Sequence, residues 1–138
     1  MIIEIIIPGQ PCAKGRPRIG SVGGRAMAFT PKKTRTREGI VASLAADAMG
    51  DKPPLEGAVS VQITAIMTIP ESWSKVKKAL ALKGLGKPIG RPDLDNIVKL
   101  ATDGMNGIVW RDDSQIVRFT AEKMYGDVAK TVVIVDTV

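Results

Sequence analysis

Histidine is absent from the 138-residue sequence, and cysteine occurs once, as Cys12. Without histidine the chain cannot build a Ser/His/Asp triad, a Cys/His nucleophile pair or a histidine-ligated zinc site. A single cysteine excludes an intrachain disulfide and a thiolate zinc site within one chain, and is typical of a reducing cytosol. A bound metal would therefore need oxygen ligands, which favours magnesium, manganese or calcium.

Long apolar runs are lacking as well. No stretch approaches the roughly 18 residues that a membrane helix needs. The apolar start, "MIIEIIIPG", has neither a basic region before it nor a small-residue cleavage site, so it predicts a strand and not a signal peptide. Length and an ordinary charged fraction predict a single globular domain over residues 1–138, with no membrane contact and a cytoplasmic location.

Positive charge is concentrated near the N-terminus. Residues 1–40 hold eight basic and two acidic side chains, so 8 − 2 = +6, which equals the formal net charge of the whole chain. A localised basic segment either forms a solvated face or binds a polyanion, and the second reading suggests nucleic acid. The eight are Lys14, Arg16, Arg18, Arg25, Lys32, Lys33, Arg35 and Arg37.

Hydrophobic periodicity predicts strands over residues 2–7, 58–70, 114–125 and 130–137, and helices over 34–49, 72–84 and from Asp93 to about Asn106. Ser72 or Ser74 would cap the second helix. Residues 8–31 form a long loop with a short hairpin near Gly23–Gly24. The last two strands are expected to pair antiparallel through Gly126–Asp127. The fold class is α+β, with a small mixed, mostly antiparallel sheet packed against helices.

Five aspartates gather in "RPDLDNIVKLATDGMNGIVWRDDSQI", residues 91–116 of an otherwise basic chain. In a helix beginning near Asp93, Asp95 and Lys99 are four residues apart and share a face, which Asp103 continues one turn on. The opposite face would pack on the sheet. Its residues are Ile97, Leu100, Ala101 and Met105.

Each acidic group also has an ordinary structural explanation. Asp93 and Asp95 could cap the helix, Asp95 and Lys99 could form a surface ion pair, and Asp112–Asp113 could make a turn. The turn could return near either end of the helix. If it reached the Asp93 end, three or four carboxylates would converge and would need a cation between them.

The segments "AKGRPR" and "RPDLDNIVKLATDGMNGIVWRDDSQI" resemble the RusA family of Holliday junction resolvases, small endonucleases often encoded by prophages. The second motif carries the specificity: D-x-D-N, a lysine three residues on, then N-G, W and D-D-x-Q. The resemblance implies an α+β subunit that works as a homodimer, binds four-way junction DNA and resolves it by paired nicks during recombination and repair. It implies Mg²⁺ as cofactor, with Mn²⁺ as a substitute, and no small-molecule cofactor.

The resemblance also assigns roles to individual residues. Asp93, Asp95 and Asp113 correspond to the family's metal-binding carboxylates, and Lys99 to a lysine needed for cleavage. Asp112 is the adjacent acid and could support the metal-binding residues without itself contacting the metal. The basic segment corresponds to a DNA-binding loop that includes Lys14, Arg16 and Arg18, followed by Lys32 and Lys33.

Three other functions share these features. A metal-dependent nuclease of broader specificity would use the same residues, and only a comparison of substrates separates it from a resolvase. A DNA-junction-binding protein without activity would not need intact Asp93, Asp95, Lys99 and Asp113. A small-molecule phosphohydrolase would not need so long a basic surface.

Overall fold

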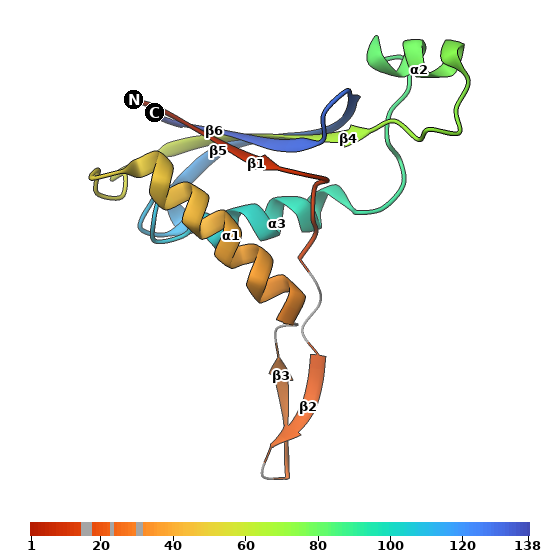
Figure 1. Ribbon diagram of the computed structural model, residues 1–138. Coiled ribbons are helices and arrows are strands. Elements are labelled where there is room, and N and C mark those ends of the chain that lie inside the picture. Colours follow the sequence, from red (N-terminus) through yellow and green to blue (C-terminus); the bar gives the residue numbers. More distant parts are fainter. Residues whose placement is uncertain (15–17, 23, 30–31) are drawn as a thin grey trace.

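The computed structural model describes residues 1–14, 18–22, 24–29 and 32–138, and Figure 1 shows their arrangement. A four-stranded sheet has the order β1-β6-β4-β5, and a separate two-stranded hairpin joins β2 to β3. The strands are β1 (Ile2–Pro8), β2 (Arg18–Val22), β3 (Arg25–Phe29), β4 (Val59–Thr68), β5 (Ile116–Gly126) and β6 (Lys130–Thr137). The helices are α1 (Lys32–Met49), α2 (Lys75–Leu82) and α3 (Leu94–Met105), with a short 3₁₀ turn, η1, at Asp113–Gln115.

Alternating apolar residues place the main sheet on its core. In β4 the side chains of Val59, Val61, Ile63 and Ala65 are all buried, as their period of two predicts. Val133 and Val135 of β6 and Ile3 and Ile5 of β1 continue this buried face across the antiparallel neighbours. The α+β class is confirmed, and so is the mixed sheet, because β4 pairs antiparallel with β6 and parallel with β5.

The expected pairing of the last two strands is wrong. β5 lies parallel to β4, while β6 pairs antiparallel with both β1 and β4. The chain therefore leaves β5 at the sheet edge and crosses β4 before it returns as β6. A turn at Gly126–Asp127 suits a hairpin locally, but β4 is apolar enough to take the central position between the two strands.

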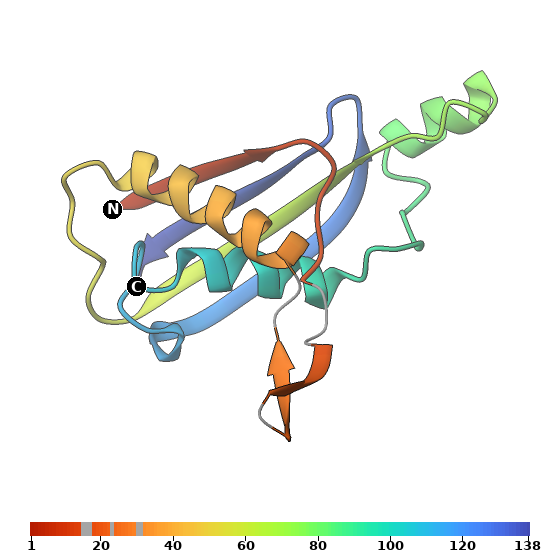
Figure 2. The same cartoon turned by 60° about the horizontal axis from the view of Figure 1, so that its bottom comes forward.

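Helices α1 and α3 cover one face of the sheet (Figures 1 and 2). Ile97, Leu100, Ala101 and Met105 of α3 are buried, as the helical spacing predicts. The two helices approach closely at Gly104, where an added Cβ would lie 2.6 Å from the Cβ of Val41. A glycine at this position lets α3 pack tightly against α1.

Two segments project from this body: the β2–β3 hairpin and α2 (Figures 1 and 2). The hairpin was expected. Ser74 is the cap of α2, and its side chain accepts a hydrogen bond from the Lys77 N–H. Within the described ranges, no helix combines the length and the hydropathy that crossing a membrane requires.

Candidate active site

The first turn of α3 presents two uncommitted carboxylates. Asp93 occupies the N-cap position, but its side chain makes no capping hydrogen bond, and Asp95 follows in the first turn. Both residues are exposed. Within the described part of the chain neither side chain takes part in a hydrogen bond or ion pair, so the capping explanation does not account for the pair.

The loop that leads into α3 is held by Lys123 of β5. Its Nζ donates to the carbonyl oxygens of Gly90 at 2.8 Å and Pro92 at 3.1 Å. Pro92 directly precedes Asp93 in the chain, and Gly90 lies three residues before it. The lysine therefore ties the start of α3, and with it the two carboxylates, to the edge strand of the sheet.

Lys99 pairs with Asp103 and not with Asp95. The Nζ of Lys99 lies 3.1 Å from Oδ1 of Asp103, one helical turn further on, while its side chain remains 57% exposed. The alternative in which Asp95 and Lys99 form a plain surface ion pair is thus contradicted. Asp95 stays available to a ligand. The ammonium group of Lys99 is bound by Asp103 and still remains in contact with solvent.

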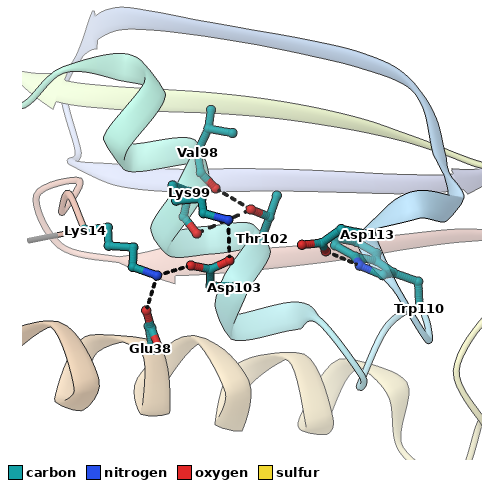
Figure 3. A network of polar contacts seen from close by, with 8 residues as sticks. All are labelled: Lys14, Glu38, Val98, Lys99, Thr102, Asp103, Trp110 and Asp113. Atoms are coloured by element: carbon teal, nitrogen blue, oxygen red, sulfur yellow. Dashed lines mark hydrogen bonds and ion pairs between the residues drawn. The ribbon is translucent and has the colours of Figure 1, made fainter. Parts of the chain in front are cut away.

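Asp103 also binds Lys14, the residue at the base of the basic loop (Figure 3). Lys14 Nζ lies 3.5 Å from Oε1 of Glu38 on α1, and its backbone N–H donates to the Asn96 carbonyl at 3.0 Å. This group of Lys14, Glu38, Lys99 and Asp103, here called the lysine–carboxylate cluster, joins α1, α3 and the loop. It fixes the point at which the chain leaves the body toward the hairpin.

The cluster shifts the pKa of two of its members. Burial by itself would raise the pKa of Asp103, but hydrogen bonds and charge from Lys14 and Lys99 outweigh it and hold that pKa below its usual range. The hydrogen bond to Asp103 raises the pKa of Lys14, and burial opposes this only in part. Both groups are therefore charged over a wide range around neutral pH.

Asp113 is held by a buried tryptophan. The indole Nε1 of Trp110 donates to Oδ1 of Asp113 at 2.8 Å, and Trp110 itself is 0% exposed, so it anchors the turn to the core. Asp112 is exposed, and hydrogen bonds from the hydroxyl and backbone of Ser114 lower its pKa. The Gln115 side chain accepts from the backbone N–H of Asp112 at 3.0 Å, which closes the turn.

This turn returns beside the C-terminal half of α3. Gly107 N–H donates to the Trp110 carbonyl at 2.8 Å, and in Figure 3 Asp113 extends toward the helix where Thr102 lies. Helical spacing puts Thr102 and Asp95 on the same side of α3. Asp113 therefore approaches the helix face that carries Asp95, but from the opposite end.

The predicted carboxylates are thus only partly brought together. Asp93 and Asp95 are neighbours, and Asp113 stands apart from them along the helix. Across the residues that the structure describes, no three acidic or cysteine side chains lie close enough to one another to hold a metal ion. Of the two ends of α3 that the turn could reach, it reaches the C-terminal one.

The predicted DNA-binding residues differ in what the structure says of them. Lys14 is engaged in the lysine–carboxylate cluster, and Lys32 is exposed at the first position of α1. Arg16 lies outside the described residues. Arg18 begins β2 and Lys33 lies in α1, but their side chains are outside the described part of the structure. Contact of these five residues with DNA stays a prediction.

Sequence reasoning missed the support given by Glu38 and Lys123. Each acts on the site from another element, α1 or β5, and nothing in its local sequence separates it from an ordinary surface charge. For Asp103 a signal existed, since it lies four residues after Lys99 on the same face. Its second partner, Lys14, lies 89 residues away in the chain and could not have been found in this way.

Comparison with known proteins places these features in a family. The family model for the endodeoxyribonuclease RusA matches residues 8–136, which include every candidate site residue. A protein of Bacillus subtilis (strain 168), named "Uncharacterized protein YqaN", is 35% identical over 127 residues. The match covers 91% of this chain and 89% of YqaN.

Proposed function

The chain belongs to the RusA endodeoxyribonuclease family, which implies a Holliday junction endonuclease, and we propose that it resolves four-way DNA junctions by magnesium-dependent hydrolysis of the backbone. The observation that carries this proposal is the start of α3. Asp93 and Asp95 are exposed carboxylates with no partner in the described chain. Asp95 lies one helical turn before Lys99, which is held by a third acid, Asp103.

The donor set suits magnesium. This ion takes oxygen ligands, keeps several waters and is commonly held by one or two carboxylates together with substrate phosphates. Asp93 and Asp95 supply two such carboxylates, which are exposed and have no partner among the residues that the structure describes. Asp113 is the third ligand that the resemblance implies, and its Oδ2 lies outside the bond to Trp110. Because Asp113 stands apart from Asp93 and Asp95 in the described chain, it would have to move toward them to share their ion. When bound, the ion would polarise the scissile phosphate and lower the pKa of a coordinated water.

Lys99 supplies positive charge to the phosphate. Its side chain is 57% exposed, so the ammonium group can contact a phosphate oxygen while Asp103 holds it from behind. A cation fixed at this position would stabilise the charge that develops on the leaving oxygen in the transition state. Lys14 lies on the other side of Asp103 and keeps that carboxylate from fully neutralising Lys99.

Lys14 also connects the site to the basic segment. Its side chain binds Asp103 and its backbone N–H binds Asn96, so the root of the β2–β3 hairpin is attached to the helix that carries the candidate carboxylates. DNA that reaches this root would therefore lie beside α3, and Arg16, Arg18, Lys32 and Lys33 are the further contacts that we propose for it. Lys14 then acts by holding the loop in place.

A homodimer accounts for paired nicks. Symmetric resolution requires cleavage of two strands, and two copies related by a two-fold axis present two such sites to the two-fold symmetric junction. We assign this work to the cytoplasm, on chromosomal or prophage DNA.

The test is a cleavage assay on a labelled synthetic four-way junction and a linear duplex of matching sequence, each with Mg²⁺. The controls are omission of the metal, its replacement by Mn²⁺, and the Asp95→Asn variant. Symmetric paired nicks in the junction alone, abolished in the variant, are the expected result. Equal cutting of junction and duplex would replace this proposal with a nuclease of broader specificity. Junction binding without cleavage in either metal would replace it with a binding protein.

A further inference from the structure

A second group of positive charges lies outside the basic N-terminal segment. Residues 72–92, here called the α2 arm, contain six cations and no acidic residue. The net charge of residues 41–138 is zero only because acidic residues elsewhere balance the arm. Its cations are Lys75, Lys77, Lys78, Lys83, Lys87 and Arg91.

The arm offers these charges to solvent. Lys75, Lys83, Lys87 and Arg91 are exposed, and in the described part of the chain none of the arm's six cations forms an ion pair with a carboxylate. Both views of the fold show α2 standing away from the sheet and from α1 and α3 (Figures 1 and 2). Unpaired like charges gathered on one projecting segment repel one another and attract a polyanion.

The arm is nevertheless fixed to the body at both ends. At its start, Trp73 packs edge-to-face on Tyr125 of β5, with ring centroids 5.2 Å apart, and Lys77 Nζ lies 3.9 Å above the Trp73 ring. At its end, Lys123 binds the carbonyls of Gly90 and Pro92. A ligand on the arm is therefore held in a set relation to Asp93, which follows Pro92 directly.

From these observations we infer that the α2 arm is a second DNA-binding element, which grips the phosphate backbone of a junction arm next to the candidate carboxylates. The inference rests on the proposed function and extends it, since the substrate would contact the protein on both sides of the start of α3. The β2–β3 hairpin lies on one side, and α2 lies on the other (Figures 1 and 2).

The geometry favours nucleic acid over a lipid surface. A helix that lies in a membrane interface needs a wide apolar face opposite its cations. Of the exposed apolar residues in α2, Val76 and Leu80 lie on one side and Leu82 lies on the other, between Lys75 and Lys78, so a helix only eight residues long has cations and apolar residues interspersed around it. The other exposed apolar residues of the arm, Leu85 and Ile89, lie beyond the helix. Charges distributed in this way suit contact with phosphates along a backbone.

The test compares two triple variants that remove the same charge. Lys75→Gln, Lys83→Gln and Lys87→Gln together neutralise the arm, while Lys52→Gln, Arg118→Gln and Lys130→Gln neutralise three cations elsewhere. Binding of a labelled four-way junction is measured in EDTA, where no cleavage occurs, between about 50 and 200 mM KCl.

We expect the arm variant to bind about tenfold more weakly. The slope of its log binding constant against log salt concentration should decrease in magnitude by up to about 0.9 for each phosphate that the arm no longer neutralises. The control variant should match wild type.

A second measurement needs no variant. Wild-type protein is acetylated with and without saturating junction DNA, and the modified lysines are identified by mass spectrometry. Protection of Lys75, Lys83 and Lys87, but not of Lys52, is expected. An equal decrease of affinity in both triple variants, or no protection of the arm, would overturn the inference.

The outcomes also separate this inference from the proposed function. If wild type cleaved the junction and the arm variant bound it with unchanged affinity, the inference about the α2 arm would be wrong and the proposed nuclease function would stand. Absence of any DNA binding by wild type would overturn both. Weaker binding to phosphatidylserine vesicles by the arm variant, with junction affinity unchanged, would make the arm a lipid-binding surface.

Discussion

Lys99 and Asp103 form an ion pair across one turn of α3, with Nζ 3.1 Å from Oδ1. Asp103 is the more enclosed of the two, with a side chain 18% exposed, and its other oxygen is bound by Lys14. One carboxylate thus lies between two ammonium groups, of which only Lys99 reaches well into solvent. This arrangement holds Lys99 in place without fully neutralising it.

Replacing Asp103 with Asn should slow cleavage strongly while weakening junction binding much less. The amide keeps the size of the side chain but leaves Lys99 without a counter-charge and Lys14 with Glu38 alone, so Lys99 loses its fixed position. We expect the cleavage rate to fall by at least about tenfold, since the charge is no longer oriented on the phosphate, and stability to fall by about 1 to 3 kcal/mol. Single-turnover cleavage and binding in EDTA separate the two effects.

The matched control for this change is Glu56→Gln. It removes an ion pair with Arg111 of similar length, 3.0 Å, whose two partners are both well exposed. Such a pair contributes little to stability. If Asp103→Asn cleaved the junction at the control's rate, Asp103 would have no role in positioning Lys99.

The contribution of Asp103 to stability should depend on pH at both extremes. Its pKa is lowered in the folded chain, so its stabilisation is complete above the unfolded value of about 3.9 and is lost as pH falls through the folded pKa. The pKa of Lys14 is raised, so its stabilisation is complete below about 10.4 and is lost as pH rises through the folded pKa.

The measurement is the difference in the free energy of unfolding between wild type and Asp103→Asn, obtained by urea denaturation at several pH values. It should be constant between about pH 5 and 10 and shrink on both sides of that window. A difference that stayed the same at the lowest and highest pH would mean that the effect of the variant does not come from the ion pairs.

Local patterns in the sequence predict the elements well, because each depends on neighbours in the chain. The alternation over β4 correctly identifies Val61 and Ile63 as buried, and the helical spacing identifies Ile97 and Leu100. The partner of a strand is a different matter. β5 has a turn after it that would suit a hairpin, yet it pairs with β4, and that choice is made by packing over the whole sheet.

In the candidate site, too, the residues that depend on local sequence could be predicted and those that depend on the whole fold could not. Asp93, Asp95 and Lys99 follow from one helix and could be placed from sequence. The position of Asp113 depends on how the chain returns after α3, and spacing could not decide between the two ends of that helix. The bond between Lys14 and Asp103 joins residues 89 positions apart, so only the folded structure reveals it. The charge of the α2 arm is visible in the sequence, but the neutral total for residues 41–138 conceals it.

Gly104 and Gly39 should respond in opposite directions to replacement by alanine. At Gly104 a Cβ would lie 2.6 Å from two carbons of the Val41 side chain and 3.1 Å from the Glu38 carbonyl oxygen, so α3 would have to move away from α1. We expect stability to fall by about 1 to 3 kcal/mol from overpacking. Gly39 is also helical, and among the described residues no atom lies within 4 Å of its added Cβ. There alanine should stabilise by about 0.5 to 1 kcal/mol. Denaturation curves give the free energy of unfolding of both variants. An unchanged value in Gly104→Ala would contradict close packing between α1 and α3.

Lys123 should matter for activity more than for stability. It lies on the edge strand, and its two hydrogen bonds run to the carbonyls of Gly90 and Pro92, within the three residues before Asp93. In Lys123→Met the apolar part of the side chain remains while the donor is removed, so the loop is no longer tied to β5. One of the two hydrogen bonds is exposed and the other only partly buried, so we expect the free energy of unfolding to fall by about 1 to 2 kcal/mol in all. Cleavage should fall by about tenfold or more, since a misplacement of about 1 Å at the reacting groups costs on the order of 10²-fold.

Because loosened carboxylates would bind the ion less well, raising the Mg²⁺ concentration should recover part of the cleavage rate in Lys123→Met but none in Asp95→Asn. Wild-type cleavage and metal dependence in Lys123→Met would show that the start of α3 keeps its geometry without this anchor.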